Sequence, residues 1–509
     1  MKNIYLTLIL AIGALGTSAQ QLVLKGHVKV LPINDSIEVN TSYDGYHWKK
    51  GSIYLKANAA GNFSKILPYK QARFVQLIYG KSTQYMLLTP GRDVQVSIAV
   101  DAGSAQFNFT GKGKPENDLL KKLKLEEEAN LPFVKELKSK YSYANWSIDS
   151  VISIKLPLIK RSLDSIGLLV KKAGLPIAIQ GAINTQLKYQ YASGLANSLA
   201  NKLNTRTNRA DFNLKYIDAV LTNFTVPQKQ ELEISAAANY YLDAYMKLKL
   251  WKGMYQYRTD KDTIHAAAIF KKDMGVVYAD LANDPDRTNE VYLFGTRLKT
   301  IVPAYAWEKH LTNLLYRFCM QGQLQTATKM MRFIKNNCED KQYILVSEKM
   351  FAPLKQQRDQ YANNLNIKIR ADYRTTSTVK DMVAPYKGKV VFVDMWGTWC
   401  PYCISDMEFE PALKERLKDK EVVFLYIARD EDEDDEKWRD FIFINNLTGE
   451  HIRRNSDQIS SVWNEFGIPD NEQAYPRYLI FDKDGKLVEK NAKRPTDKAG
   501  LAVQIEKYL

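Results

Sequence analysis

Residues 390–403 read VVFVDMWGTWCPYC, and they decide the fold of the C-terminal part of the chain. The first half of this stretch is a continuous apolar run, which is typical of a strand buried on both faces of a sheet. The segment 403–420, CISDMEFEPALKERLKDK, follows with the periodicity of a helix. Cys400 and Cys403 therefore fall in the first turn of that helix, where their i, i+3 spacing puts both sulfur atoms on one face.

The position of this cysteine pair favours redox chemistry. The start of a helix offers unpaired N–H groups and the positive end of the helix dipole, and both stabilise a thiolate. In CxxC proteins the pKa of the first cysteine falls to between about 3.5 and 7.5. Cys400, nearer the helix end and the solvent, is the expected nucleophile, and Cys403 would resolve the mixed disulfide.

Two other interpretations of the pair are weaker. A zinc site needs four ligands, but Cys319 and Cys338 lie far upstream and the five histidines are not clustered. A purely structural disulfide across two intervening residues would close a very small loop and would constrain little. The sequence therefore predicts a redox-active pair and no metal.

The chain beyond this helix alternates strand and helix patterns. A second buried strand is predicted at 421–428, and a hairpin at 476–490 turns at the sequence DKDG. Helices are predicted at 435–446, 456–467 and 496–509. This order predicts an α/β layer fold with a mixed sheet.

The run DEDEDDE at 430–436 follows the second strand. It lacks the glycine and the alternating spacing of a calcium-binding EF-hand loop. Acidic residues are favourable at a helix N-terminus, so a solvated loop that leads into the next helix is the expected structure.

From YKGKVVFVDMWGTWC (386–400) to YPRYLIFDKDGKLVEKNAKRP (475–495), the chain resembles the thioredoxin superfamily and its exported TlpA/ResA-like thiol–disulfide oxidoreductases. The resemblance covers about residues 366–509. It implies a thioredoxin-like fold in which Cys400 is the attacking cysteine and Cys403 is the resolving one. It implies no cofactor.

The resemblance also implies roles for neighbouring residues. Trp399 matches the tryptophan beside the disulfide, and Asp394 matches a buried acid that could accept the proton of the resolving cysteine. Asp406 stands where ResA-like proteins often carry a glutamate. Tyr475–Pro476 matches the family's cis-proline, whose preceding backbone binds extended substrates. The alternatives are an Asp394 that pairs locally and a trans proline that opens an edge strand.

The sequence departs from the family pattern between the two cysteines. Many relatives carry Gly-Pro there, whereas Pro401-Tyr402 is the glutaredoxin-like dipeptide. Because related CxxC proteins range from reductants to oxidants, this departure leaves the direction of the reaction open. The resemblance itself favours a reductase that receives electrons from a membrane thiol donor.

Two further regions precede this one. Residues 20–112 alternate apolar and polar residues between turn signals, which predicts an antiparallel β-sandwich-like domain. Residues 113–365 show helical periodicity and predict a helical domain. The fold class is therefore multidomain, with β, α and thioredoxin-like α/β parts. The β-rich part loosely resembles a domain of unknown function that precedes such modules in secreted bacterial proteins.

The N-terminal sequence predicts export. Residues 1–19 have a positive start, a short apolar run and an A-x-A-like site, as a signal peptide does. No later stretch is apolar for long enough to span a membrane. The net charge of +15 is spread along the chain, so no nucleic-acid partner is expected. Cys319 and Cys338 are expected to be buried and unpaired with each other.

These observations predict a periplasmic or cell-envelope thiol–disulfide oxidoreductase that acts on cysteine-containing exported proteins. Its site residues would be Cys400, Cys403, Asp394 and Pro476, with Trp399 and Tyr475 contacting the substrate. The alternative is an envelope protein that binds a ligand or partner and uses the thioredoxin-like part as a scaffold.

Overall fold

The computed structural model describes residues 22–29, 36–41, 43–67, 71–101, 104–123, 151–203, 210–274, 277, 299, 302–373, 375, 378–497 and 499–509. The chain divides into two compact units, Met1–Met320 with Thr328–Phe351, and Gln321–Ala327 with Ala352–Leu509. The predicted β-rich and helical regions thus share one unit, and the domain boundaries at 112 and 365 stay predictions. The predicted signal peptide lies outside the described residues.

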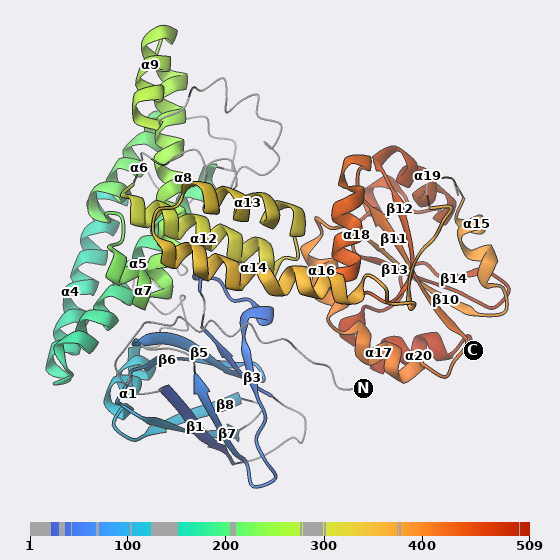
Figure 1. Ribbon diagram of the computed structural model, residues 1–509, viewed down its shortest axis with the longest axis horizontal. Coiled ribbons are helices and arrows are strands. Elements are labelled where there is room, and N and C mark those ends of the chain that lie inside the picture. Colours follow the sequence, from blue (N-terminus) through green and yellow to red (C-terminus); the bar gives the residue numbers. More distant parts are fainter. Residues whose placement is uncertain are drawn as a thin grey trace. The chain divides into compact units, whose positions relative to one another are not determined.

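The β-rich part of the first unit contains two four-stranded sheets with the orders β4-β1-β7-β8 and β3-β2-β5-β6 (Figure 1). Their strands are β1 (Leu22–Val28), β2 (Ile37–Asn40), β3 (Ile53–Leu55), β4 (Asn62–Leu67), β5 (Arg73–Tyr79), β6 (Ser82–Leu88), β7 (Val94–Asp101) and β8 (Ser104–Thr110). The inward-facing residues of both sheets form one apolar core. The sandwich is therefore confirmed, with one departure: β1 and β7 pair in parallel.

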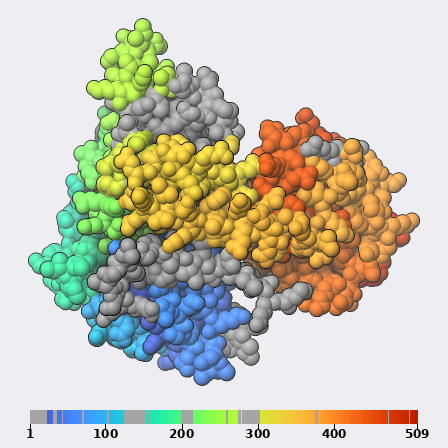
Figure 2. All heavy atoms as spheres, viewed as in Figure 1, coloured from blue at the N-terminus to red at the C-terminus, as the bar shows by residue number. Residues whose placement is uncertain are grey.

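The helical part of the first unit follows the predicted periodicity. Its helices are α1 (Lys114–Leu123), α4 (Leu156–Lys172), α5 (Ile177–Leu203), α6 (Ala210–Asn223), α7 (Lys229–Ile234), α8 (Ala236–Thr259), α9 (Thr263–Met274), α12 (Ala304–Met320) and most of α13 (Leu324–Asn337), together with the first half of α14 (Lys341–Tyr361). The tip of the α8–α9 hairpin projects from this unit (Figures 1 and 2). Most of α12 is buried around its whole circumference, which makes it the central helix of this part.

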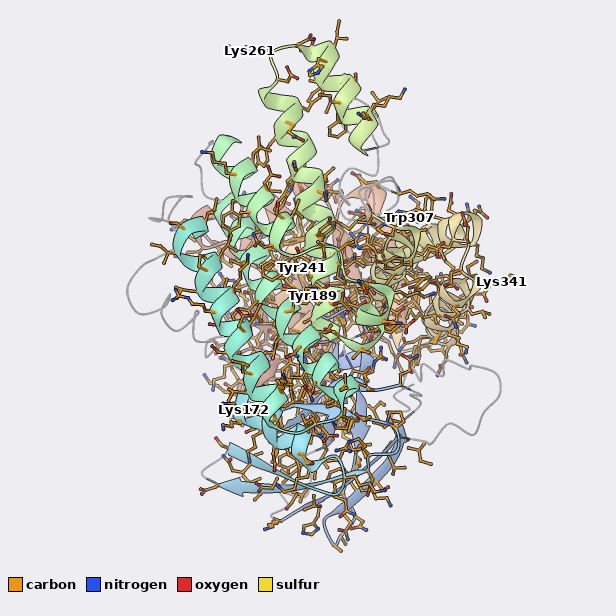
Figure 3. The ribbon with its side chains drawn as sticks, turned by 90° about the vertical axis from the view of Figure 1, so that its left-hand side faces the viewer. Lys172, Tyr189, Tyr241, Lys261, Trp307 and Lys341 are labelled. Carbon is orange, nitrogen blue, oxygen red and sulfur yellow. A yellow bond between two sulfur atoms is a disulfide. The ribbon has the colours of Figure 1, made fainter. Side chains whose placement is uncertain are left out.

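Aromatic and charged side chains join the elements of the first unit. Tyr189 on α5 stacks on Tyr241 on α8, with 5.5 Å between the ring centroids (Figure 3). Arg317 on α12 forms ion pairs with Asp243 on α8 and with Asp44 in the loop after β2. Because these charges are buried, each needs its partner, and the network ties the β-rich part to the helices.

The second unit is built on one six-stranded mixed sheet with the order β14-β13-β10-β11-β12-β9. Its strands are β9 (Ile367–Ile369), β10 (Val390–Trp396), β11 (Val422–Arg429), β12 (Gly449–Arg454), β13 (Arg477–Phe481) and β14 (Leu487–Glu489). β10 pairs in parallel with β11 and antiparallel with β13. All seven residues of β10 are buried, as its continuous apolar sequence predicts.

Helices cover both faces of this sheet (Figure 1). They are α15 (Val379–Val383), α16 (Pro401–Met407), α17 (Glu410–Leu417), α18 (Asp435–Ile444), α19 (Ser456–Phe466) and α20 (Ala499–Glu506). One apolar core lies between the sheet and α18 and α19, and a second lies between the sheet and α17 and α20. This three-layer arrangement confirms the predicted α/β fold.

Two details of the sheet and its helices differ from the sequence prediction. The strands β9 and β12 are additional, because β12 (GEHIRR) carries charged residues that do not resemble a buried strand. The predicted helix 403–420 is two helices that meet at Glu408 and Phe409. Pro411 has no N–H to donate and its ring would clash with a preceding carbonyl, so the chain starts a new helix there.

Candidate active site

Cys400 and Cys403 form a disulfide at the start of α16, with 5.4 Å between their Cα atoms. Cys400 is the N-cap residue, and its Sγ accepts a hydrogen bond from the backbone N–H of Cys403 at 3.2 Å. Pro401 follows as the first helical residue, where its fixed φ suits a helix start. The N–H of Cys403 and the positive end of the helix dipole thus face Cys400 Sγ, which stabilises its thiolate when the pair is reduced.

The exposure of Cys400 differs from the expectation that it lies near solvent. Its exposed fraction is 2% in the disulfide form, against 0% for Cys403. The side chains of Trp399 and Tyr402, by contrast, are 46% and 68% exposed. Both sulfur atoms therefore lie within the core cluster, and large aromatic residues supply the surface next to them in sequence.

Trp399 belongs to an aromatic cluster that includes the residue before the predicted cis-proline. Its indole N–H donates to the backbone carbonyl of Arg429 at 2.7 Å. Its ring lies edge-on to Tyr475, with 5.3 Å between centroids, and Tyr475 also contacts Trp463. The Tyr475–Pro476 peptide bond is cis, as predicted. The structure thus brings Trp399 and Tyr475 together from distant parts of the sequence.

Asp430 holds the loop that precedes the disulfide. Its carboxylate accepts hydrogen bonds from the backbone N–H of Thr398, at 3.1 and 3.2 Å, and from the Thr398 hydroxyl at 2.5 Å. Burial raises the pKa of Asp430 to about 6. Asp430 begins the acidic run 430–436, and the prediction that this run is solvated is wrong at this residue, which is 1% exposed. The physical reason is the parallel pairing of β10 and β11, which puts the loops after both strands at one edge.

Asp394 lies on β10 and is almost completely buried. Neither of its carboxylate oxygens receives a hydrogen bond from a donor among the described residues. Burial raises the pKa of Asp394 well above its usual range, and the neighbouring carboxyl of Glu410 raises it further. The structure therefore has the buried acid that was predicted and not the alternative of a locally paired aspartate, and the protonated form of Asp394 is strongly favoured.

Asp406 and Glu410 are equally buried but have partners. Asp406 forms a bidentate ion pair with Arg494, whose guanidinium donates to the two carboxylate oxygens at 2.7 and 2.9 Å. Asp406 also accepts a hydrogen bond from the hydroxyl of Tyr478 at 2.8 Å. One oxygen of Glu410 is bound by the Tyr426 hydroxyl, and the ammonium of Lys414 lies 3.2 Å from it. Asp394 thus has two buried carboxyl groups as neighbours, and of the three it alone has no cation or donor among the described residues.

Sequence reasoning missed Asp430, Glu410, Lys414 and Tyr426. Glu410 and Lys414 have the i, i+4 spacing of an ordinary exposed ion pair, so their sequence carries no sign of burial. For Asp430, a usable signal existed: it closely follows the second predicted buried strand, and the ends of two strands joined by a helix lie at one edge of a sheet. In the described part of the chain, no group of three or more His, Cys, Asp or Glu residues is placed to hold a metal ion.

Comparison with known proteins locates the similarity in the second unit. The Redoxin family model matches residues 366–504. The ResA thiol–disulfide oxidoreductases of Bacillus thuringiensis (strain Al Hakam) and Bacillus anthracis are each 32% identical over 123 residues, which is 24% of this chain and 63% of theirs. The chain thus spans less than two thirds of the length of these relatives.

Similar solved structures cover the same part of the chain. The thioredoxin domain of a thiol–disulfide oxidoreductase from Bacteroides vulgatus is 24% identical, covers 25% of this chain and 83% of its own, and has a TM-score of 0.22. A thioredoxin family thiol:disulfide interchange protein from Chlorobium tepidum is 18% identical over 25% of this chain and 83% of its own, with a TM-score of 0.21.

The second unit, with its mixed sheet and its CxxC disulfide at a helix start, defines a thioredoxin-superfamily domain. Within that superfamily, residues 366–504 are similar to the TlpA/ResA-like proteins. Among the described residues, no helix has the length and apolar character that crossing a membrane requires.

Proposed function

We propose that this protein is an exported thiol–disulfide oxidoreductase that reduces disulfides of envelope proteins through Cys400 and Cys403. The observation that carries the proposal is the placement of the pair: Cys400 caps α16 and its Sγ accepts a hydrogen bond from the N–H of Cys403. The identity of the curated relatives, all thiol–disulfide oxidoreductases, supports the same chemistry. Export and an envelope location rest on the N-terminal sequence 1–19.

The proposed reaction moves two electrons to the substrate. The thiolate of Cys400 attacks one sulfur of the substrate disulfide, and the other sulfur leaves as a thiolate that takes a proton from water. Cys403 then gives its proton to Asp394 and attacks Cys400 Sγ. The Cys400–Cys403 disulfide forms, the mixed disulfide breaks, and the second substrate thiolate leaves. A membrane dithiol donor would return the pair to its reduced form.

The aromatic cluster supports a role in substrate binding. The exposed ring of Trp399 contacts Tyr475, and Tyr475 precedes the cis bond to Pro476. A backbone carbonyl and N–H at this point would pair with an extended substrate segment, while Trp399 would contact its side chains. We therefore propose Trp399, Tyr475 and Pro476 as substrate-contacting residues.

An insulin reduction assay tests the proposed activity. The full-length protein with dithiothreitol should accelerate insulin reduction, and Cys400→Ser should abolish the acceleration. Cys403→Ser keeps the nucleophile but removes the resolving thiol, so it should form mixed disulfides that are visible on non-reducing gels. Cys319→Ser is a matched control, because it also removes one thiol. If the wild-type protein does not accelerate the reaction and Cys403→Ser forms no mixed disulfide, the proposal is wrong.

Alkylation of thiols in intact cells tests the direction. A reductase is kept reduced by its donor, so Cys400 and Cys403 should be alkylated mainly as free thiols. A pair found mainly as the disulfide would identify an oxidase instead.

A further inference from the structure

Asp394 and Glu410 present three buried oxygen atoms that receive no hydrogen bond from any donor in the described residues. They are both oxygens of Asp394 and Oε1 of Glu410. Carboxylate oxygens only accept hydrogen bonds. If both carboxyls were ionised, the three buried oxygens would have no donor and the two negative charges would repel each other. A single proton removes both problems, because a protonated carboxyl donates to the other. The arrangement thus has the chemistry of two acids that share one proton.

The charges around Asp394 do not offset two negative groups. The charged and titratable side chains that face it are Glu410 and Lys414 on α17, Asp406 on α16, Tyr426 on β11 and Tyr478 on β13. Asp406 is already neutralised by Arg494. Lys414 is then one cation for the two carboxyls of Asp394 and Glu410. Its ammonium lies 3.2 Å from Glu410, 2.5 Å from the Tyr426 hydroxyl and 2.7 Å from the carbonyl of Thr448.

The break between α16 and α17 places Glu410 in this position. α16 ends at Met407 and α17 begins at Glu410, with Pro411 in its first turn. Glu410 therefore starts a new helix axis instead of continuing the one that carries Cys403. Its side chain is 1% exposed, whereas Glu415 on the same helix α17 is exposed. Glu410 is thus the buried carboxyl of this helix that lies next to Asp394 on β10.

We propose that Glu410 is a positioning residue for the redox step. In the disulfide form Glu410 shares one proton with Asp394. In the reduced form the charge of Glu410 keeps Asp394 a strong proton acceptor. This inference rests on the proposed function for its catalytic meaning. In the disulfide form, the Asp394 carboxyl donates its proton to Oε1 of Glu410. Lys414 and Tyr426 hold the negative charge of Glu410 on its other oxygen.

The same pair then accounts for the proton balance of the resolving step. Before the step, Cys403 and the two carboxyls hold one proton between them, and Cys403 reacts from the state in which it carries that proton and both carboxyls are ionised next to Lys414. Transfer of the proton from Cys403 Sγ to Asp394 relieves the repulsion and leaves the thiolate that attacks Cys400 Sγ. One S–S bond forms and one breaks, and the leaving electron pair departs on the substrate thiolate.

Infrared spectroscopy of the full-length protein tests the shared proton without any assay of activity. The oxidised protein should show a carbonyl band of a buried protonated carboxyl that is absent from Asp394→Asn. In a pH titration, Glu410→Gln should lose this band at a pH lower than wild type by about one unit or more, because it removes the neighbouring charge. Glu415→Gln is the matched control on the same helix and should titrate like wild type.

A second variant protects the test against a Glu410→Gln protein that does not fold. Tyr426→Phe removes the hydroxyl that binds Glu410, so the charge of Glu410 is less well stabilised and the shared proton should be held to a higher pH. Shifts in opposite directions in the two variants support the pair. Equal titration of wild type, Glu410→Gln and Tyr426→Phe would overturn it.

Kinetics connect the pair to the redox step. The rate at which a preformed Cys400 mixed disulfide collapses should fall in Glu410→Gln, and its pH profile should move with the infrared titration. A structural role alone would change the unfolding midpoint but not that profile. Failure of insulin reduction in wild type would reject the proposed function while leaving the infrared result standing, so the two failures can be told apart.

Discussion

This chain has two sets of two cysteines, the bonded Cys400 and Cys403 and the unbonded Cys319 and Cys338, and the two sets lie at opposite ends of helices. Cys400 caps the N-terminus of α16 and is bonded to Cys403, whereas Cys319 lies near the C-terminus of α12 and Cys338 directly follows α13. Both of the latter are free and buried, as predicted. Burial raises the pKa of Cys319, and burial together with Glu308 raises the pKa of Cys338 to about 12. Because Cys400 and Cys403 are no more exposed than Cys319 and Cys338, the comparison teaches that the end of the helix, and not exposure, distinguishes the redox pair from the inert thiols.

Thiol alkylation should give the largest difference between the two pairs. At pH 7 a thiol with the pKa of Cys338 is almost wholly protonated, while a thiolate at a helix N-terminus is substantially populated. The lower intrinsic nucleophilicity of a stabilised thiolate offsets part of this advantage. In the reduced protein, Cys400 should therefore react with iodoacetamide at least about 100-fold faster than Cys338, measured by mass spectrometry of the labelled peptides.

Denaturation provides the control for this measurement. In concentrated urea all four thiols should react at similar rates, because both the helix ends and the burial are lost. Fast labelling of Cys319 or Cys338 in the native protein would contradict the assignment of these residues as inert.

Replacement of Trp399 tests a second difference between the two cysteine pairs, which is substrate binding. Cys400 has the exposed aromatic ring of Trp399 next to it in sequence, whereas Cys319 and Cys338 have no such neighbour. Trp399→Ala should raise the KM for a disulfide peptide about 10-fold, with a smaller change in kcat, since an exposed aromatic contact is worth about 1–2 kcal/mol. Tyr54→Ala, at an exposed tyrosine of β3, is the matched control and should change neither constant. A similar loss, about 10-fold, in kcat with an unchanged KM would instead show that Trp399 acts in the chemical step and not in binding.

The strand, the turn and the helix start that carry Cys400 were predictable because their signals are local. The apolar run of β10 and the proline after the first cysteine each report the structure of their own segment. By contrast, β12 was missed because Arg453 and Arg454 resemble surface residues. Arg453 is buried because Asp432 and Asp435, from the segment after the neighbouring strand, pair with it. Such pairs depend on the finished fold, and a local pattern does not contain them.

The candidate site shows the same division between local and tertiary information. Asp394 was predicted from the family resemblance, on its position six residues before Cys400, and the prediction that it is buried is confirmed. Its partner Glu410 was not, because the break at Glu408 and Phe409 changes the direction of a residue that a continuous helix would have placed elsewhere. The roles of both residues in the reaction stay predictions until they are measured.

Asp430 should make the stability of the site depend on pH. Its pKa is raised from 3.8 to about 6 in the folded protein, so between these values the folded state binds more protons than the unfolded state. Stability contributed by this group therefore falls as the pH rises from about 4 to about 6, and is constant above that range. Relative to Asp430→Asn, wild type should lose about 3 kcal/mol of unfolding free energy over this interval.

Hydrogen exchange of the peptide that covers β10, corrected for the pH dependence of intrinsic exchange, measures this effect where Asp430 acts. The pKa of Asp44 is also raised to about 6 by burial, but Asp44 is present in both proteins and cancels in the difference. Parallel pH profiles of wild type and Asp430→Asn would show that Asp430 does not titrate in this range.

Removal of Cys319 should have the smallest effect, and it closes the comparison between the two pairs. Cys319→Ala deletes one buried heavy atom, which costs about 1 kcal/mol of unfolding free energy, within the range for removing a single buried group. Insulin reduction should be unchanged, because Cys319 contributes packing and not a thiolate. Urea unfolding measures the first quantity and the reduction assay the second. A loss of activity in a stably folded Cys319→Ala protein would mean that the C-terminal end of a helix can also hold a redox thiol, and the rule drawn from the two pairs would fail.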